Sequence, residues 1–146
     1  MRLAIAADHA AVTLKDELAG WLRDAGHEVL DLGTQGPASV DYPDFGRRLA
    51  DAVADGQADR GIALCGSGIG ISIAVNRNRA CRCALVSEPL SARLAREHND
   101  ANVIAMGARV IGPEMARECI EAFLSTDFLG GRHARRVELL SQKEPA

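Results

Sequence analysis

The chain has 146 residues and a mass of 15.5 kDa, which suits one ordinary domain with one hydrophobic core, expected over residues 1–146. Apolar residues make up 47% of the chain, and this fraction excludes an intrinsically disordered protein. Seventeen lysines and arginines stand against 20 aspartates and glutamates, so the net charge of −3 argues against a nucleic-acid partner.

Short apolar runs alternate with helical patterns along the whole chain. In chain order the predicted elements are a strand over 2–7, a helix from about 12 that stops at Gly26, a strand over 27–32, a helix over 43–55, a strand over 61–65, a helix over 71–75, a strand over 83–86, a helix over 89–98, a strand over 101–107, and helices over 113–124 and 132–141. Five nearly continuous apolar strands alternating with helices are typical of an α/β fold, with a parallel sheet covered on both faces.

Polar and glycine-rich segments follow the predicted strands. In an open α/β sheet, ligands bind outside the carboxyl ends of the strands, so these segments are candidate sites. They are Asp8 and His9, the loop that starts at Gly33, Cys65–Gly70, Ser87 and Glu88, and Gly107–Arg109. Asp8 taken alone fits a helix N-cap equally well, because aspartate is a preferred capping residue.

The sharpest local signal is the sequence CGSGIG at residues 65–70. Its three glycines let the backbone approach a ligand closely, and the start of the following helix offers N–H groups to an anion. A helix N-terminus also favours a thiolate, so Cys65 is a candidate base or nucleophile. A buried, inert cysteine at the end of a strand is the alternative interpretation.

Three known loop motifs do not match this segment. The third glycine comes one residue too early for Gly-x-Gly-x-x-Gly, the dinucleotide fingerprint. The run Gly70-Ile71-Ser72 lacks the lysine of a P-loop, and Ile71 stands where a cysteine phosphatase has arginine. Nucleotide binding and phosphatase chemistry are therefore disfavoured.

Two further segments carry side chains suited to proton transfer or phosphate binding. His98-Asn99-Asp100 ends the fourth helix, where the histidine would either transfer protons near neutral pH or cap the helix end. Arg132 and Arg136 are four residues apart and share one helix face. That spacing suits a bound phosphate, but it is also typical of a solvated basic face.

The sequence lacks the features of a secreted, membrane or metal protein. No apolar run approaches the ~18 residues of a membrane helix, and Asp8 and Lys15 fall where a signal peptide needs apolar residues. We expect a cytoplasmic protein with no membrane partner. The four cysteines form no Cys-x-x-Cys pair and are expected to be thiols. Cys81-x-Cys83 has no third ligand nearby, so we expect no metal site.

Six motifs occur together and cover the chain from residue 1 to about 140. They are Asp8-His9, DYPDFG at 41–46, CGSGIGISIA at 65–74, EHNDANV at 97–103, GARVIG at 107–112 and GGRHARRV at 130–137. In this order they resemble ribose-5-phosphate isomerase, type B, whose family also holds allose-6-phosphate and galactose-6-phosphate isomerases.

The resemblance implies a three-layer α/β/α Rossmann-like sandwich with a five-stranded parallel sheet. It implies a homodimer or homotetramer, no cofactor, and the interconversion of ribose 5-phosphate and ribulose 5-phosphate. It also implies a shared site, in which His98, Asn99 and Arg109 of one subunit complete the pocket that holds Asp8 and Cys65 of the other.

The resemblance also implies roles for individual residues. Cys65 would be the base that moves a proton between C2 and C1 through an enediolate, with Ser67 beside it, and His98 with Asp8 would open the sugar ring. The enediolate would be stabilised by Asn99 and by the backbone of Gly66, Gly68, Ile69 and Gly70. Tyr42 would line the pocket, and the phosphate would be bound by His9, Arg109, Arg132 and Arg136.

Departures from the family pattern affect the substrate more than the reaction. Some members carry a glutamate base at the position of Ile71, so this chain resembles the cysteine type. Ala11 and Val12 stand where many members have glycine and an aromatic residue. Another sugar phosphate, a hexose or a tetrose, is therefore the alternative substrate. A receiver-like module is disfavoured, because Cys65 and Met106 occupy the positions of its aspartate and lysine.

Overall fold

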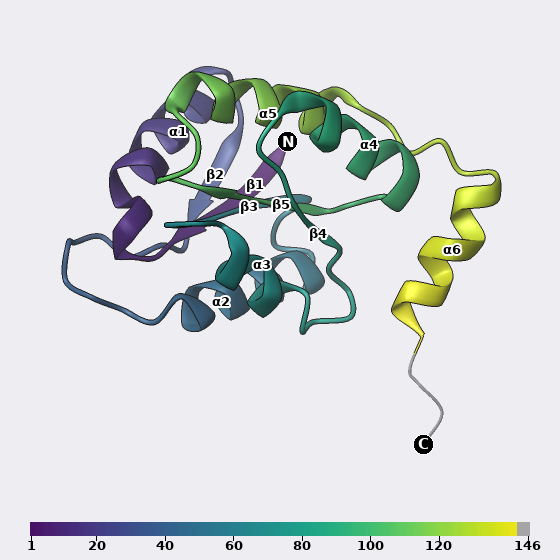
Figure 1. Cartoon of the computed structure of the whole chain (residues 1–146), viewed down its shortest axis with the longest axis horizontal. Coiled ribbons are helices and arrows are strands. Elements are labelled where there is room, and N and C mark those ends of the chain that lie inside the picture. Colours follow the sequence, from purple (N-terminus) through teal and green to yellow (C-terminus); the bar gives the residue numbers. More distant parts are fainter. Residues whose placement is uncertain (143–146) are drawn as a thin grey trace.

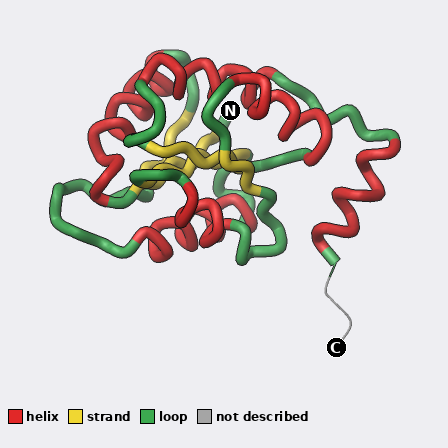
Figure 2. The backbone as a smooth tube through the Cα atoms, viewed as in Figure 1, coloured by secondary structure: helices red, strands yellow, loops and turns green. Residues whose placement is uncertain are grey.

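The computed structural model describes residues 1–142, and a five-stranded sheet crosses its centre (Figure 1, Figure 2). The strands are β1 (Arg2–Ala7), β2 (Glu28–Asp31), β3 (Arg60–Cys65), β4 (Cys83–Leu85) and β5 (Val103–Gly107). All neighbouring pairs are parallel, in the order β2-β1-β3-β5-β4. The expected α/β fold with a five-stranded parallel sheet is confirmed. The last residues of the predicted domain, 143–146, lie outside the described residues.

Helices cover both faces of this sheet. They are α1 (Val12–Asp24), α2 (Tyr42–Ala54), α3 (Ile69–Val75), α4 (Pro89–Asn99), α5 (Pro113–Ser125) and α6 (Arg132–Ser141), with a short 3-10 helix at His9–Ala11. Figure 1 shows α2 and α3 on one face, α1, α4 and α5 on the other, and α6 standing beside the body in yellow. Within residues 1–142, no helix has the length and hydropathy needed to cross a bilayer.

The two faces of the sheet differ in side-chain size because strand residues alternate between faces. Large side chains pack against α1, α4 and α5, and they include Leu3, Ile5, Ile62, Leu64, Ile104 and Met106. Alanines dominate the face toward α2 and α3, and they include Ala4, Ala6, Ala63 and Ala105. A β-carbon at Gly46 of α2 would lie 2.8 Å from that of Ala74, so glycine is needed where α2 meets α3.

The connections of the chain create a crevice between β1 and β3. The chain passes from β1 to β2 on one side and then to β3 on the other, so the strand order reverses between β1 and β3. Ligands of open α/β sheets bind at such a reversal, outside the carboxyl ends of the strands. The backbone N–H of Asp8 donates to the carbonyl of Leu64 at 3.3 Å, which joins the two strand ends.

Candidate active site

Cys65 ends β3 inside this crevice, and the glycine loop folds around its sulfur. Only 4% of the residue is exposed, and the backbone N–H of Gly68 donates to Sγ at 3.1 Å. Gly68 has a φ of 78°, and a β-carbon there would lie 2.7 Å from the backbone of Met106. The left-handed backbone lets α3 begin at Ile69, two residues earlier than predicted. The loop thus aims an N–H group at the Cys65 sulfur.

Two side-chain contacts complete the loop. The Ser67 hydroxyl accepts from the N–H of Ile69 at 3.2 Å, so the N–H groups of Gly68 and Ile69 both bind within the loop. The ring of Tyr42 lies against Gly70, where a β-carbon would come within 2.5 Å of the ring carbon Cζ. Glycine is therefore required at position 70 for Tyr42 to keep its place.

A cavity of about 390 Å³ opens in front of Cys65. It is lined by Asp8, His9, Ala10, Tyr42, Cys65, Gly66, Ser67, Gly70, Arg109 and Val110. Most of these residues were predicted to belong to one site. Ala10 and Val110 were not, because nothing in an apolar side chain signals that it lines a cavity.

Asp8 and His9 are held in place by the backbone around them. One carboxylate oxygen of Asp8 accepts from the N–H of Ala10 at 3.1 Å, so Asp8 caps the 3-10 helix as well as lining the cavity. Nδ1 of His9 accepts from the N–H of Val40 at 3.1 Å. A neutral imidazole then carries its proton on Nε2, where it can donate to an anion. The sequence gives no signal for this long-range contact.

Arg109 lies beside the glycine loop of its own chain. A β-carbon at Gly66 would be 3.2 Å from Nη1 of Arg109, and the backbone N–H of Arg109 donates to the Gly66 carbonyl at 3.0 Å. The expectation that Arg109 reaches the Cys65 pocket from another subunit is therefore wrong. The turn after β5 brings it there, because Gly107 pairs with Cys65 in the sheet.

The remaining predicted residues are His98, Asn99, Arg132 and Arg136. Together with His133 they form a second group, which we call the α4–α6 cluster. The rings of His98 and His133 are stacked, with centroids 4.4 Å apart. The segment does end the helix as the capping alternative expects, with Asp100 as the C-cap of α4 and His98 in its last turn. Desolvation, the nearby His98 and the positive Arg132 and Arg136 together lower the pKa of His133. This surface is suited to an anion.

The α4–α6 cluster and Cys65 lie at opposite edges of the sheet. Helix α4 ends at Asn99 and leads into β5 at Val103, whereas Cys65 pairs with Gly107 at the far end of β5. The strand between them spans about 13 Å at ~3.3 Å per residue. Within one chain the structure does not bring His98, Asn99, Arg132 and Arg136 to the cavity.

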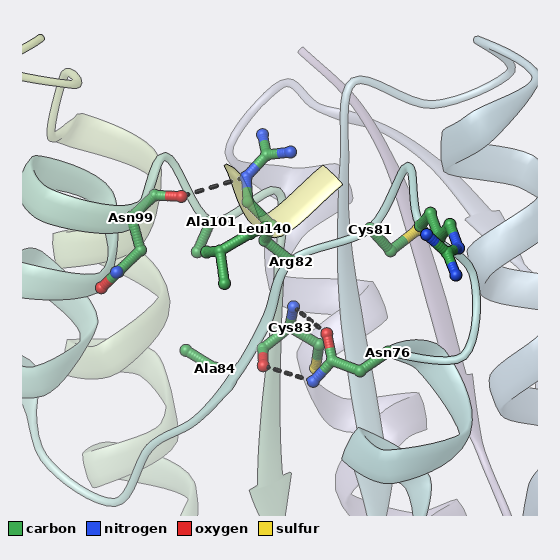
Figure 3. A pocket seen from close by; sticks show the side chains of 9 residues that line it. Asn76, Cys81, Arg82, Cys83, Ala84, Asn99, Ala101 and Leu140 are labelled. Carbon is green, nitrogen blue, oxygen red and sulfur yellow. Dashed lines mark hydrogen bonds between the residues drawn. The ribbon is translucent and has the colours of Figure 1, made fainter. Parts of the chain in front are cut away.

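A second cavity, of about 420 Å³, lies where Asn99 of α4 and Leu140 of α6 face Cys83 and Ala84 of β4 (Figure 3). It is lined by Asn76, Arg79, Cys81, Arg82, Cys83, Ala84, Asn99, Ala101 and Leu140. Desolvation raises the pKa of Cys81 to about 11 and raises the pKa of Cys83 as well. These two thiols stay protonated at neutral pH, and the cavity offers no base.

Comparison with known proteins gives one consistent result. Residues 3–140 match the model of a family described as Ribose/Galactose Isomerase. The chain is 44% identical to ribose-5-phosphate isomerase B of Escherichia coli over 98% of this chain and 96% of that protein. It is 43% identical to D-erythrulose-4-phosphate isomerase of Pectobacterium atrosepticum over 99% and 95%. A structure of ribose-5-phosphate isomerase B from Clostridium thermocellum superposes with a TM-score of 0.95 at 48% identity, covering 97% of this chain and 95% of that one.

Proposed function

The chain belongs to the ribose/galactose isomerase family, and we propose that it interconverts ribose 5-phosphate and ribulose 5-phosphate with Cys65 as the base. The family relationship establishes an aldose–ketose isomerase of sugar phosphates. The observation that carries the finer assignment is the position of Cys65, in a cavity with Asp8, His9, Tyr42 and Arg109.

The proposed reaction moves one proton between two carbon atoms. The Cys65 thiolate takes the proton from C2 of the open-chain aldose, and the electron pair of that C–H bond forms the C1–C2 double bond of the enediolate. The C1 carbonyl electrons move to O1 as the enediolate forms, and the proton of the C2 hydroxyl then passes from O2 to O1. The same thiol returns the carbon-bound proton to C1, and the C2–O2 bond becomes the carbonyl of the ketose. The N–H that donates to Sγ at 3.1 Å supports this role, because it stabilises negative charge on the sulfur. Negative charge on the enediolate oxygen would be met by the loop backbone at Gly66 and Gly70 and by Asn99.

The phosphate would lie at the outer end of the cavity. His9 carries its neutral-state proton on Nε2, and Arg109 supplies a guanidinium within the same cavity. A guanidinium suits a phosphate because it offers two parallel N–H donors. Arg132 and Arg136 would add to this site from a second copy of the chain, since they lie in the α4–α6 cluster.

We propose that the active site is shared between two copies in a homodimer or a higher homo-oligomer. Helix α6 supports this arrangement, because none of its 10 residues is buried and its Leu139 and Leu140 are exposed. Ile69, Ile73 and Leu85 are also exposed, and they lie on α3 and β4 next to the glycine loop. Exposed apolar groups of this kind mark an interaction surface. His98 of the second copy, with Asp8 of the first, would then open the sugar ring.

A direct comparison of substrates tests the finer assignment. We expect kcat/KM to be highest for ribose 5-phosphate when ribose 5-phosphate, allose 6-phosphate, galactose 6-phosphate and erythrose 4-phosphate are compared under one set of conditions. The alternative is another sugar phosphate, and the 43% identity to a tetrose-phosphate isomerase makes the tetrose the informative competitor. A higher kcat/KM for the tetrose or a hexose would overturn the pentose assignment and leave the isomerase reaction in place.

A further inference from the structure

The end of α4 has an unusual backbone directly after His98 and Asn99. Asp100 has φ and ψ of 44° and 43°, and among residues 1–142 it is the one non-glycine residue with positive φ. A β-carbon crowds the backbone in this left-handed conformation, which persists only where the surroundings hold it. The chain reverses here on its way into β5, directly after His98 and Asn99.

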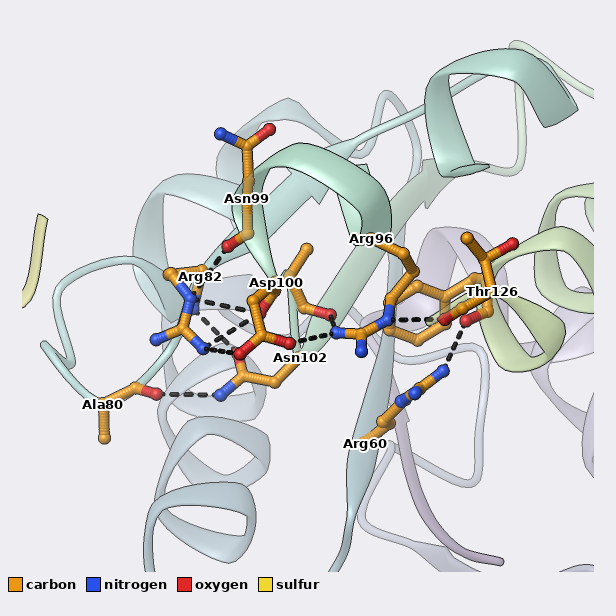
Figure 4. A network of polar contacts seen from close by, with 10 residues as sticks. Arg60, Ala80, Arg82, Arg96, Asn99, Asp100, Asn102 and Thr126 are labelled. Carbon is orange, nitrogen blue, oxygen red and sulfur yellow. Dashed lines mark hydrogen bonds and ion pairs between the residues drawn. The ribbon is translucent and has the colours of Figure 1, made fainter. Parts of the chain in front are cut away.

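Arg96 holds the side chain of Asp100 from below the helix end. The Arg96 side chain is buried, and its Nη1 donates to Oδ1 of Asp100 at 2.8 Å and to the carbonyl of Ala101 at 2.7 Å. Its Nε donates to the carbonyl of Thr126 at 3.2 Å. A buried guanidinium with three partners has one orientation, and Figure 4 shows it between Asp100 and Thr126.

Arg82 holds the backbone on the other side of Asp100. Its Nη2 donates to the Asp100 carbonyl at 2.9 Å, and its Nε donates to the Asn99 carbonyl at 3.0 Å. Nη2 also lies 3.4 Å from Oδ2 of Asp100. The last carbonyls of a helix lack partners within the helix, and Arg82 supplies them. Arg82 and Arg96 thus hydrogen-bond both the backbone carbonyl and the carboxylate of Asp100.

The network is anchored in neighbouring parts of the fold. Asn102 accepts from the backbone N–H of Arg82 at 2.8 Å and donates to the carbonyl of Ala80 at 2.8 Å, which ties the network to the segment that enters β4. Thr126 follows α5, and the N–H of Leu129 donates to the Glu97 carbonyl at 3.1 Å. The end of α4 and the segment that leads into α6 are therefore fixed together.

The network leaves the side chains before Asp100 available. Asn99 contributes its backbone carbonyl, and its amide points away from the arginines in Figure 4. Among the hydrogen bonds of residues 1–142, none involves that amide or the imidazole of His98. The imidazole stacks on His133 alone.

We propose that Asp100, which Arg82 and Arg96 hold by hydrogen bonds, is a positioning residue. It orients His98 and Asn99 toward the active site of a second copy. This role rests on the proposed function, because it acts through two residues assigned there. Asp100 touches no substrate. It sets the direction of the helix end, and its contacts keep that direction the same in every copy of the chain.

The test compares three substitutions at position 100 by kcat and KM for ribose 5-phosphate. Asp100→Ala removes the carboxylate and disfavours the left-handed backbone, so kcat should fall at least about tenfold. Asp100→Asn keeps an acceptor oxygen for Arg96 and tolerates positive φ, so it should retain most of the activity. Asp100→Gly can adopt the left-handed backbone but lacks the carboxylate, so its kcat should lie between those of Asp100→Ala and Asp100→Asn. Arg93→Gln, at an exposed ion pair on the same helix, is the matched control and should change little.

A double-mutant cycle separates positioning from general damage. In the His98→Ala background, Asp100→Ala should lower kcat by less than it does in the wild type, because one of the two residues it positions is gone. The proposal would be overturned if the fold-decrease in kcat of the double variant equalled the product of the two single decreases. It would also be overturned if Asp100→Ala, Asp100→Asn and Asp100→Gly lowered kcat equally. If His98→Ala itself were fully active, the proposed shared site would fail instead. If Asp100→Ala does not fold, Arg82→Met replaces it in the same double-mutant cycle, because it removes the hydrogen bonds to the carbonyls of Asn99 and Asp100.

Discussion

At the scale of single residues, three cysteines of the chain differ in chemistry because their surroundings differ. Cys65 borders the cavity and accepts a hydrogen bond from a backbone N–H. Cys119 lies in the core between the sheet and its helices, and desolvation raises its pKa to about 11. Desolvation raises the pKa of Cys81 to the same value. At neutral pH these two thiols are protonated and unreactive.

Replacement of the proposed base should abolish most of the turnover. We expect Cys65→Ala to lower kcat at least about a hundredfold with little change in KM, because the residue acts on the reacting carbon and not on substrate binding. Cys119→Ala is the control. Its kcat should stay near the wild-type value, although its stability falls with the loss of a buried side chain. Near-normal turnover by Cys65→Ala would exclude the proposed base.

Alkylation should distinguish the same cysteines without mutation. Iodoacetamide at neutral pH should label Cys65 before Cys81 or Cys119, whose thiols stay protonated. Ribose 5-phosphate should slow the labelling, since it would fill the cavity. Peptide mapping by mass spectrometry measures both effects. Labelling that starts at Cys119, or that substrate leaves unchanged, would contradict the assignment.

The sequence predicts single residues unevenly, and the reason is the range of their contacts. The Cys65 loop is predictable from the sequence, because glycines at alternate positions indicate a tight loop whose backbone needs residues without a side chain. The contact between Arg109 and Gly66 depends on the pairing of β3 with β5, and the N–H of Val40 reaches His9 across 31 positions. Residue spacing carries no information about such contacts, and the expectation that Arg109 comes from another subunit followed from the family resemblance alone.

At the scale of elements, a buried lysine joins α1 to the strand beside it. Lys15 is fully buried in α1, and its Nζ lies 2.7 Å from Asp31 at the end of β2 and 2.9 Å from Asp16. Burial favours the neutral amine, but the hydrogen bonds to both carboxylates outweigh it, so the pKa of Lys15 lies above its usual value. The Asp31 carboxylate also accepts from the N–H of Gly33 at 2.9 Å, which starts the loop toward the cavity.

Removal of this lysine should destabilise the fold. Lys15→Met leaves Asp31 without its buried partner, so the free energy of unfolding should fall by about 3 kcal/mol in urea titrations. Arg47→Met breaks the exposed pair with Asp44 and should cost less than about 1 kcal/mol.

The same pair predicts a dependence on pH. Because the folded-state pKa of Lys15 is raised, its contribution to stability is complete below the usual pKa of 10.5 and is lost as the pH rises through the folded value. The difference in stability between wild type and Lys15→Met should therefore narrow above about pH 10.5. If wild type and Lys15→Met differ little in their free energy of unfolding at neutral pH, or if the difference stays constant into the alkaline range, the pair does not stabilise the fold.

Element positions are well predicted, because apolar runs and helix signals are local. The strand expected over 27–32 is β2 at Glu28–Asp31, and the helix expected over 132–141 is α6 at Arg132–Ser141. The 3-10 helix at His9–Ala11 was not predicted, since three residues are too few for periodicity. The burial of Lys15 was also unexpected, because a lysine in a helix usually faces solvent.

At the scale of the whole molecule, the sheet separates the two groups of side chains to which we assign roles in the proposed reaction. Cys65 and Asp8 lie at the carboxyl ends of β3 and β1, and the α4–α6 cluster lies beyond the opposite edge. A symmetric dimer would use the same surface of both copies and would form two equivalent sites. The sequence predicts which strand or helix carries each of these residues. Residue spacing does not predict the surface through which two copies would associate.

Mixing two impaired variants tests the proposed shared site most directly. Cys65→Ala and His98→Ala should each keep only a small residual activity alone, and they should be dissociated, mixed in equal amounts and reassociated. Random pairing makes about half of the dimers mixed, and each mixed dimer has one site with both lesions and one with neither. About a quarter of wild-type activity on ribose 5-phosphate should therefore return. No recovery, with subunit exchange verified by mass spectrometry, would show that each site is built within one chain.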